Sequence, residues 1–121
     1  MSDLTRRLLA TVDIGRVAKA RRENFMLLHA RLAGLNLLSL DATAIAAPMC
    51  YPLLIPKPGL RKFLIGKRIF IPQYWEGVGR GDGFEIERFI VDDLVPLPCD
   101  QRYGPSDMRR VLDALDAFFN Q

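Results

Sequence analysis

The residues from Pro105 onward constrain the fold most, because they specify one amphipathic helix. Pro105 suits the first helical position, and Asp107 favours the positively polarised end of a helix. Apolar residues then recur on one helix face: Met108, Val111, Leu112, Leu115, Phe118 and Phe119. With 121 residues, of which 50 % are hydrophobic and 26 % charged, the chain can bury that face in one domain spanning residues 1–121.

Two further helices are expected before residue 34. The first covers residues 3–11, and the second covers residues 13–33 and ends near Gly34. In the short helix, the inward-facing residues are predicted to be Leu4, Leu8 and Leu9. In the long helix, the predicted buried stripe comprises Ile14, Val17, Ala18, Phe25, Leu28 and Leu32. Arg21 falls on this stripe, so its guanidinium is expected to reach water or a carboxylate.

The centre of the chain alternates extended and helical signals. Apolar runs predict strands at 49–55, 69–71 and 94–97, while helices are expected after Pro58-Gly59 and over 84–93. In the second of these helices, the residues expected to face inward are Ile86, Phe89 and Ile90. The order predicts an α+β, two-layer domain in which helices cover a small three-stranded sheet.

The polar loop Asp100-Gln101-Arg102-Tyr103 is the first candidate site. In a purely structural interpretation, Asp100 caps a turn, Arg102 pairs with an acid and Tyr103 covers the core. In a functional interpretation, the carboxylate, amide and guanidinium of Asp100, Gln101 and Arg102 bind an anionic or hydroxyl-rich ligand at the mouth of a pocket. The chemistry of these residues alone leaves both interpretations open.

Tyr74 and Trp75 form the second candidate. They follow the extended segment 69–71 and precede the glycine-rich segment Gly77–Gly83, which is expected to be a flexible surface loop. Aromatic side chains often close the edge of a core, but they also stack on sugar and cofactor rings. The glycine-rich segment itself matches neither the phosphate-binding loop nor the dinucleotide fingerprint.

Several other functions are disfavoured. His29 is the only histidine and lacks the partners of a catalytic triad or a zinc site. Cys50 and Cys99 are expected to be reduced, buried thiols. The longest uncharged run, residues 42–56, is shorter than the roughly 20 apolar residues that a membrane span needs. Without a secretory signature, a cytoplasmic protein is expected.

Motifs along most of the chain resemble the C-terminal small domain of the DegT/StrS-type, pyridoxal-phosphate-dependent sugar aminotransferases. In chain order they are Arg22-Glu23-Asn24, Tyr51-Pro-Leu-Leu-Ile55, Leu64-Ile65 with Ile69-Phe-Ile-Pro72, Trp75, Leu97-Pro98 with Asp100 to Tyr103, and Asp107-Met108. The resemblance implies the small-domain fold of fold-type I aminotransferases, and it implies that Tyr74, Trp75, Asp100, Gln101 and Arg102 line the pocket mouth. The family usually has glycine where Arg68 stands, so we expect a helix end shifted toward Gly66.

The resemblance transfers no catalytic residue and no cofactor-binding residue. Transamination needs a lysine that holds pyridoxal phosphate as a Schiff base, and in these enzymes that lysine belongs to a large domain absent from this sequence. None of the lysines here lies in a comparable segment: Lys19, Lys57, Lys62 and Lys67. No metal is expected. Pyridoxal phosphate would enter only through pairing with a large domain.

The resemblance therefore implies a free-standing or truncated C-terminal domain that is inactive alone. As a subunit or interaction module, it would form a homodimer or bind a protein carrying the large domain. The alternative is a small basic nucleic-acid-binding or dimerising domain with no link to transamination. A net charge of +3 and a basic side of the long helix, with Arg16, Lys19 and Arg22, favour that alternative. Asp13 and Glu23 dilute this charge, so nucleic-acid binding is the weaker hypothesis.

Overall fold

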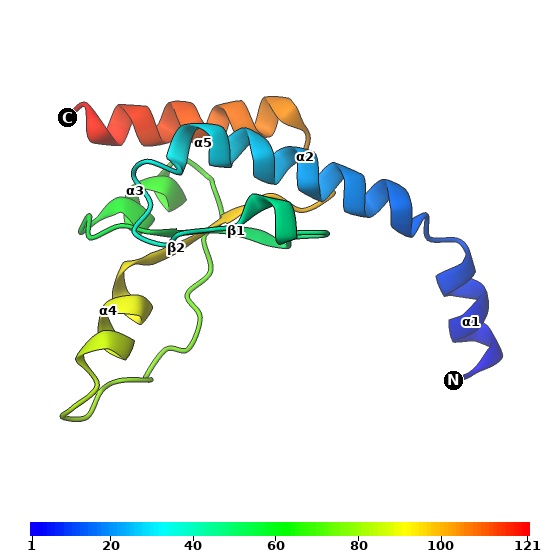
Figure 1. The fold of residues 1–121 in the computed structure, drawn as a ribbon, viewed down its shortest axis with the longest axis horizontal. Helices are drawn as coiled ribbons and strands as arrows, with labels where there is room; N and C mark the ends of the chain where they lie inside the picture. Colours follow the sequence, from blue (N-terminus) through cyan, green and yellow to red (C-terminus); the bar gives the residue numbers. More distant parts are fainter.

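The computed structural model describes residues 1–121 as a small α+β domain with five α-helices and one two-stranded sheet (Figure 1). The elements follow the order α1 (Asp3–Ala10), α2 (Ile14–Leu32), a 3₁₀ turn (Ala42–Ala44), β1 (Cys50–Leu54), α3 (Leu60–Gly66), α4 (Glu85–Asp93), β2 (Leu94–Pro98) and α5 (Pro105–Phe119). No helix has both the length and the apolar character that crossing a bilayer would require.

The sheet is an antiparallel pair in which Tyr51 lies opposite Leu97 and Leu53 opposite Val95. These four side chains are buried, because alternate residues of a strand point to the same face. Pro52 lies opposite Pro96. Prolines are tolerated in both strands because each strand has only one neighbouring strand, so a residue without an amide hydrogen can lie where its nitrogen faces away from that neighbour.

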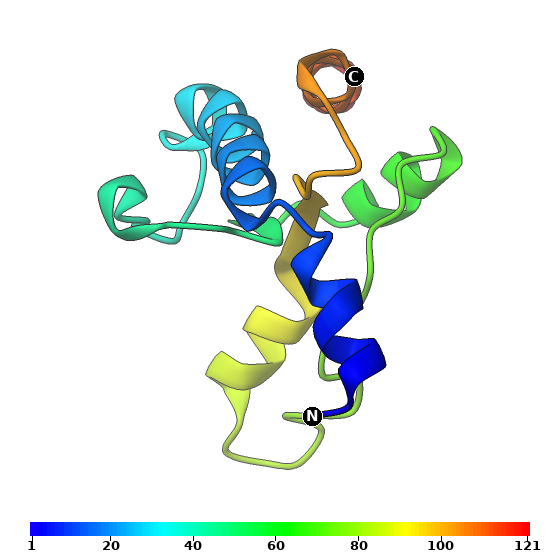
Figure 2. The same ribbon diagram turned by 90° about the vertical axis from the view of Figure 1, so that its right-hand side faces the viewer.

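Helices α2 and α5 lie side by side over one face of the sheet (Figures 1 and 2). The core forms where their apolar stripes meet the sheet, and α3 closes one end of it. The apolar side chains that these three helices bury in the core are Phe25, Leu28 and Leu32 of α2, Leu60 and Leu64 of α3, and Met108, Val111 and Leu115 of α5. Each such side chain contributes roughly 1.5–3 kcal/mol through its removal from water.

The predicted third strand is not formed. Residues 69–71 show the alternating burial of a strand, since Ile69 and Ile71 are buried while Phe70 is 73 % exposed. They nevertheless pair with neither β1 nor β2, and the sheet has only two strands. The alternating burial therefore shows that one side of this extended segment packs on the core. It does not require that the backbone pair with another strand.

Helix α1 differs from its prediction in packing rather than in extent. Leu4, Leu8 and Leu9 were expected to face inward, but they are 68 %, 59 % and 54 % exposed. Ile14 at the start of α2 is also exposed, and α1 projects from the body (Figure 1). In α4, Ile86 is exposed and Val91 is the buried residue.

The expectation that a shifted helix end would spare Arg68 the left-handed conformation is wrong. Helix α3 ends at Gly66, and Arg68 adopts φ 60°, in the left-handed region. The Arg68 amide donates to the Ile65 carbonyl (2.9 Å) and the Ile69 amide donates to the Leu64 carbonyl (3.0 Å). These two bonds form the cap that usually carries glycine at this position. An arginine there strains the backbone.

Replacement of Arg68 by glycine should therefore stabilise the protein. Arg68→Gly removes the left-handed strain while keeping both capping hydrogen bonds, and we expect the free energy of unfolding to rise by about 1 kcal/mol. Urea denaturation measures the change. The control is Lys67→Gly at the adjacent residue, whose φ of −85° gains nothing from glycine. Equal effects of the two substitutions would contradict the strain at Arg68.

Candidate functional site

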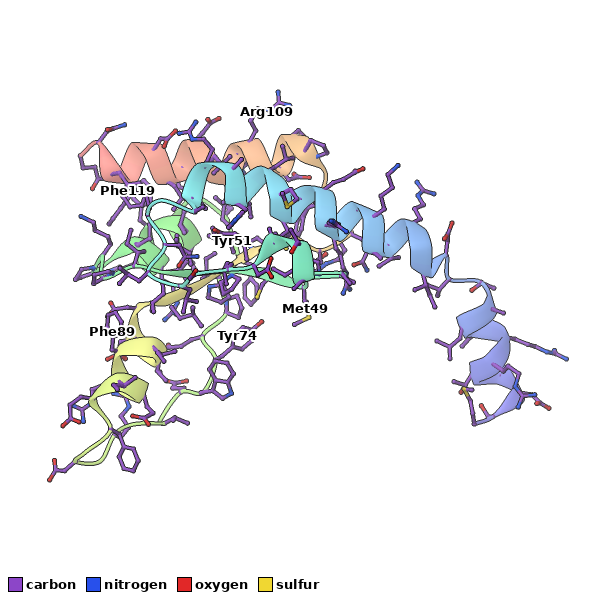
Figure 3. All side chains as sticks on the ribbon, in the orientation of Figure 1. Met49, Tyr51, Tyr74, Phe89, Arg109 and Phe119 are labelled. Atoms are coloured by element: carbon purple, nitrogen blue, oxygen red, sulfur yellow. The ribbon has the colours of Figure 1, made fainter.

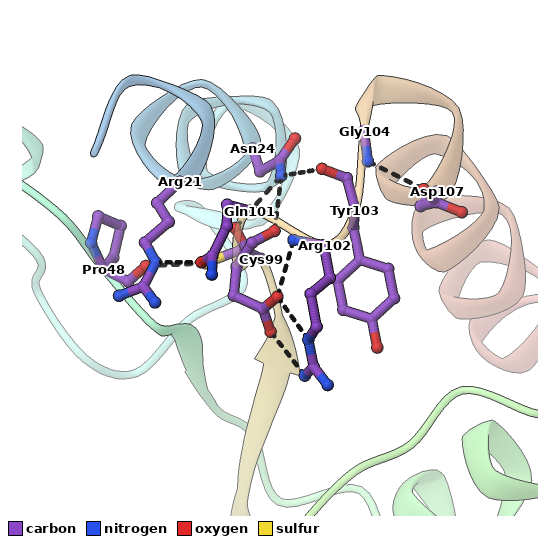
Figure 4. Close-up of polar contacts among 10 residues, drawn as sticks. Arg21, Asn24, Pro48, Cys99, Gln101, Arg102, Tyr103, Gly104 and Asp107 are labelled. Carbon is purple, nitrogen blue, oxygen red and sulfur yellow. Dashed lines mark hydrogen bonds and ion pairs between the residues drawn. The ribbon is translucent and has the colours of Figure 1, made fainter. Parts of the chain in front are cut away.

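A buried amide positions the loop between β2 and α5 (Figure 4). Asn24 of α2 is 2 % exposed. Its Nδ2 lies 3.2 Å from the Cys99 carbonyl oxygen, 3.2 Å from that of Asp100 and 2.9 Å from that of Tyr103. One side chain thus binds three backbone carbonyls of the loop and ties it to α2.

Within this loop, Asp100 and Arg102 form a two-pronged ion pair. Asp100 Oδ1 accepts from Arg102 Nε (2.9 Å) and from the Arg102 amide (3.0 Å), while Oδ2 accepts from Nη2 (2.9 Å). The hydrogen bond from the Arg102 side chain is the main reason that the pKa of Asp100 lies below its usual value. Asp100 is 7 % exposed, whereas the Arg102 side chain is 71 % exposed. The buried carboxylate therefore holds a guanidinium that remains accessible.

Arg102 stands at the edge of a hollow of about 130 Å³. Other parts of its lining come from Asp100 and Tyr103, from Tyr74 and Phe70, and from Pro98 at the end of β2. Figure 3 shows Tyr74 on the side of the sheet that faces away from α2. The hollow thus combines aromatic side chains, the phenolic groups of two tyrosines and a fixed cation, which together suit a ligand with an anionic group and a flat or hydroxyl-rich body.

The structure brings together three of the five predicted pocket residues: Tyr74, Asp100 and Arg102. Gln101 lies outside the hollow, because its Oε1 accepts a hydrogen bond from Arg21 Nε of α2 (2.6 Å). Arg21 therefore binds an amide oxygen rather than the water or carboxylate expected. Trp75 is 62 % exposed and lines a separate groove with Val78 and Ile90.

The two cysteines are unpaired thiols. Burial raises the pKa of Cys99 to about 12, with smaller contributions from Cys50 and the negative charge of Asp100. Burial also raises the pKa of Cys50. A thiol that stays protonated is a poor nucleophile and a poor metal ligand. The chain holds no group of three histidine, cysteine or acidic side chains placed to bind a metal ion.

The residues around the hollow do not fit pyridoxal phosphate as a resident cofactor. That cofactor needs a lysine amine within reach of its aldehyde. All four lysines are exposed and none of them lines the hollow. Lys19 pairs with Glu23, and the Lys67 ammonium lies over the Phe63 ring.

Sequence reasoning assigned no role to Asn24, although a signal for one is present. Asn24 lies four residues before Leu28 and next to Phe25, so it falls on the buried stripe of α2. A buried amide on such a stripe must find hydrogen-bond partners. The position alone does not reveal that these partners are the carbonyls of the loop after β2.

No family model, no curated protein and no solved structure matches this chain.

Removing the Asn24 amide should destabilise the domain. Asn24→Ala leaves three carbonyls without this donor, and we expect a loss of about 2 kcal/mol of unfolding free energy, measured by urea denaturation. Gln101→Ala, a change at an exposed residue of the same loop, is the matched control and should change stability little. If the two variants lose the same amount, Asn24 does not organise the loop.

The Asp100–Arg102 pair predicts a pH dependence of stability. Because the pKa of Asp100 is lower in the folded protein than in the unfolded chain, its contribution is complete at neutral pH. The contribution begins to fall near pH 4, the ordinary range of an aspartate, and is lost as the pH drops through the lowered folded value. The stability difference between the unsubstituted protein and Asp100→Asn, measured by denaturation from pH 7 to pH 2, should therefore shrink in acid. A difference that is constant across this range would contradict the shift.

Proposed function

We propose that this chain is a small domain of aminotransferase type that works as a subunit or interaction module of a pyridoxal-phosphate-dependent sugar aminotransferase. The cofactor-binding large domain would lie outside residues 1–121, and these residues alone would be inactive. The observation that carries the proposal is the accessible Arg102 guanidinium, held by buried Asp100 beside Tyr74 at the edge of one hollow.

Two further features support this proposal. Asn24 belongs to the Arg-x-Asn motif on which the resemblance rests, and in this chain it binds the loop that carries Asp100 and Arg102. Arg68 stands where the resembling enzymes usually have glycine, and its backbone has the left-handed conformation that glycine favours. The chain would thus keep the family's backbone at a position where it lacks the family's residue.

In this proposal, the chain's own residues bind and orient one end of the substrate. Arg102 Nη1 makes no hydrogen bond within the chain, so it can donate to a carboxylate or phosphate of the ligand. Tyr74 offers a ring for stacking and a hydroxyl for a directed hydrogen bond. Asp100 acts through Arg102 by fixing the plane of its guanidinium, which makes it a positioning residue. Pyridoxal phosphate would supply the amino-transfer chemistry from the large-domain protein.

The test is reconstitution with a cofactor-loaded large-domain protein that lacks a small domain of its own. We expect the two proteins to copurify and amino transfer to a sugar substrate to appear only in the mixture. Arg102→Gln should lower kcat/KM by about 10- to 100-fold, the effect of losing a hydrogen bond from a charged group. The matched control is Arg109→Gln, since Arg109 points outward from α5, away from the sheet (Figure 3).

Failure of the two proteins to associate would overturn the proposal. So would borohydride trapping of pyridoxal phosphate on a lysine of this chain alone, because the chain would then hold its own cofactor. Arg102→Lys keeps the positive charge but loses the planar, two-pronged set of hydrogen-bond donors. The activity that this variant retains measures the contribution of the charge, and the activity that it loses measures the contribution of directed hydrogen bonds. Thermal denaturation of each variant checks that the domain remains folded.

A further inference from the structure

A second, smaller hollow adjoins the candidate site and shares Phe70 and Tyr103 with it. Its volume is about 50 Å³, and its lining includes Arg68, just after α3, and Arg110 of α5. We propose that Arg68 and Arg110 bind a phosphoryl group in this hollow, carried by a small phosphate monoester or by free phosphate. This inference goes beyond the proposed function, because it involves neither Arg102 nor amino transfer.

The backbone of Arg68 is strained in a way that its own side chain does not compensate. Its φ is 60°, and its exposed guanidinium makes no hydrogen bond or ion pair within the chain. Strained conformations of this kind are concentrated at binding sites, where the surrounding structure holds them in place. Glycine would form the same helix cap without strain, so what arginine adds at this position is a free guanidinium at the edge of the hollow.

Arg110 is held close to Arg68 by a hydrogen bond. Its Nη2 donates to the carbonyl oxygen of Lys67, the residue before Arg68 (2.8 Å). This bond carries the Arg110 side chain from α5 across to the end of α3, while Nε and Nη1 of Arg110 make no hydrogen bond within the chain. Two guanidiniums that border one hollow offer planar sets of donors, and such sets match the oxygens of a phosphate.

The size of the hollow limits which part of a ligand can enter. A cavity needs roughly 10–15 Å³ to hold one water molecule, so the 50 Å³ of this hollow correspond to about four. A group of four oxygens around one phosphorus is of this size, whereas a sugar ring or a nucleotide base is larger. The phosphoryl group would therefore occupy the hollow, and the rest of a monoester would lie outside it.

The charge of the lining favours a ligand with more than one negative charge. Arg68 and Arg110 contribute two positive charges, and Asp107 contributes one negative charge. Asp107 Oδ2 accepts from the Gly104 amide (2.9 Å; Figure 4) at the positively polarised start of α5, which offsets part of that negative charge. Tyr103, whose hydroxyl makes no hydrogen bond within the chain, is a further donor. A phosphate monoester carries about −1.5 to −2 charges at pH 7, so it matches two guanidiniums better than a carboxylate does.

NMR titration of the purified full chain with inorganic phosphate and with glycerol 3-phosphate tests the proposal. We expect both probes to cause saturable shifts of the amide resonances of residues 67–69 and 107–111. The probe that binds more tightly distinguishes free phosphate from a monoester. Arg68→Gly should raise the dissociation constant about tenfold or more, because it removes hydrogen bonds from a charged group. The same substitution should make the domain more stable, so weaker binding in this variant cannot result from unfolding.

Two further variants separate a specific site from general attraction to positive charge. Arg109→Gln is the matched control, because Arg109 points outward from α5 and its loss changes the net charge as much as Arg68→Gly does (Figure 3). This variant should bind phosphate as the unsubstituted protein does. Asp107→Asn should bind phosphate more tightly, because it removes the one negative charge of the lining and keeps an oxygen for the Gly104 amide.

The absence of any saturable shift would overturn the proposal. So would equal weakening by Arg68→Gly and Arg109→Gln, which would indicate non-specific attraction, or weaker phosphate binding by Asp107→Asn. Weakening by Arg102→Gln without weakening by Arg68→Gly would place the anion in the hollow beside Arg102 and would also overturn it. The titration needs no large-domain protein, so its failure is distinguishable from failure of the proposed function.

Discussion

The carboxamide of Asn24 is the interaction on which the arrangement of the domain depends. It joins the middle of α2 to three carbonyls of the segment that leaves β2 and enters α5. Most of that segment is outside helix and strand, so its carbonyls need a partner from elsewhere. With the loop fixed, the Gly104 amide donates a hydrogen bond to Asp107 Oδ2 (2.9 Å) at the start of α5, and Asp100 can direct Arg102 into the hollow. The same amide therefore orders the core and the candidate site.

A second asparagine, Asn36, explains why the sheet has no third strand beside β1. Asn36 donates to the Pro52 carbonyl (2.8 Å) and accepts from the Leu54 amide (2.9 Å), and the Leu37 amide donates to the Leu54 carbonyl (3.0 Å). These bonds occupy the edge of β1 where a third strand would otherwise pair. Residues 69–71 consequently contribute apolar side chains to the core without joining the sheet.

The sequence predicts well those elements whose signals are local. Helices α2 and α5 and strands β1 and β2 lie close to their predicted bounds, because their apolar spacing, prolines and glycines act within a few residues. The spacing of apolar residues shows that a helix has an apolar face, but it does not show what covers that face. For that reason the sequence predicts that the leucines of α1 are buried in the core, although the structure exposes them to solvent. The left-handed backbone of Arg68 was missed for a related reason: an arginine gives no sign that two capping hydrogen bonds will outweigh its strain.

The sequence predicts the part of the candidate site that depends on local geometry, and it does not predict the part that depends on the tertiary fold. Asp100 and Arg102 are two residues apart in a tight turn, so local geometry is enough to pair them. Tyr74 reaches them only through the path of residues 68–75, which is a tertiary property. Gln101 and Trp75 are sequence neighbours of the site residues, yet their side chains lie elsewhere. The turn after β2 directs Gln101 toward Arg21 of α2, and the left-handed backbone at Trp75 directs its ring into a separate groove.

Residues 68–75 connect the hollow beside Arg102 with the separate groove that Trp75 lines. This segment begins and ends at the only non-glycine residues with positive φ, Arg68 and Trp75. Between them, Phe70 and Tyr74 line the hollow beside Arg102, whereas Trp75 lines the groove with Val78 and Ile90. The rings of Tyr74 and Trp75 lie 5.7 Å apart, centroid to centroid. A backbone change at Trp75 would therefore displace the aromatic wall of the hollow as well, because both surfaces are built on the same short stretch of strained chain.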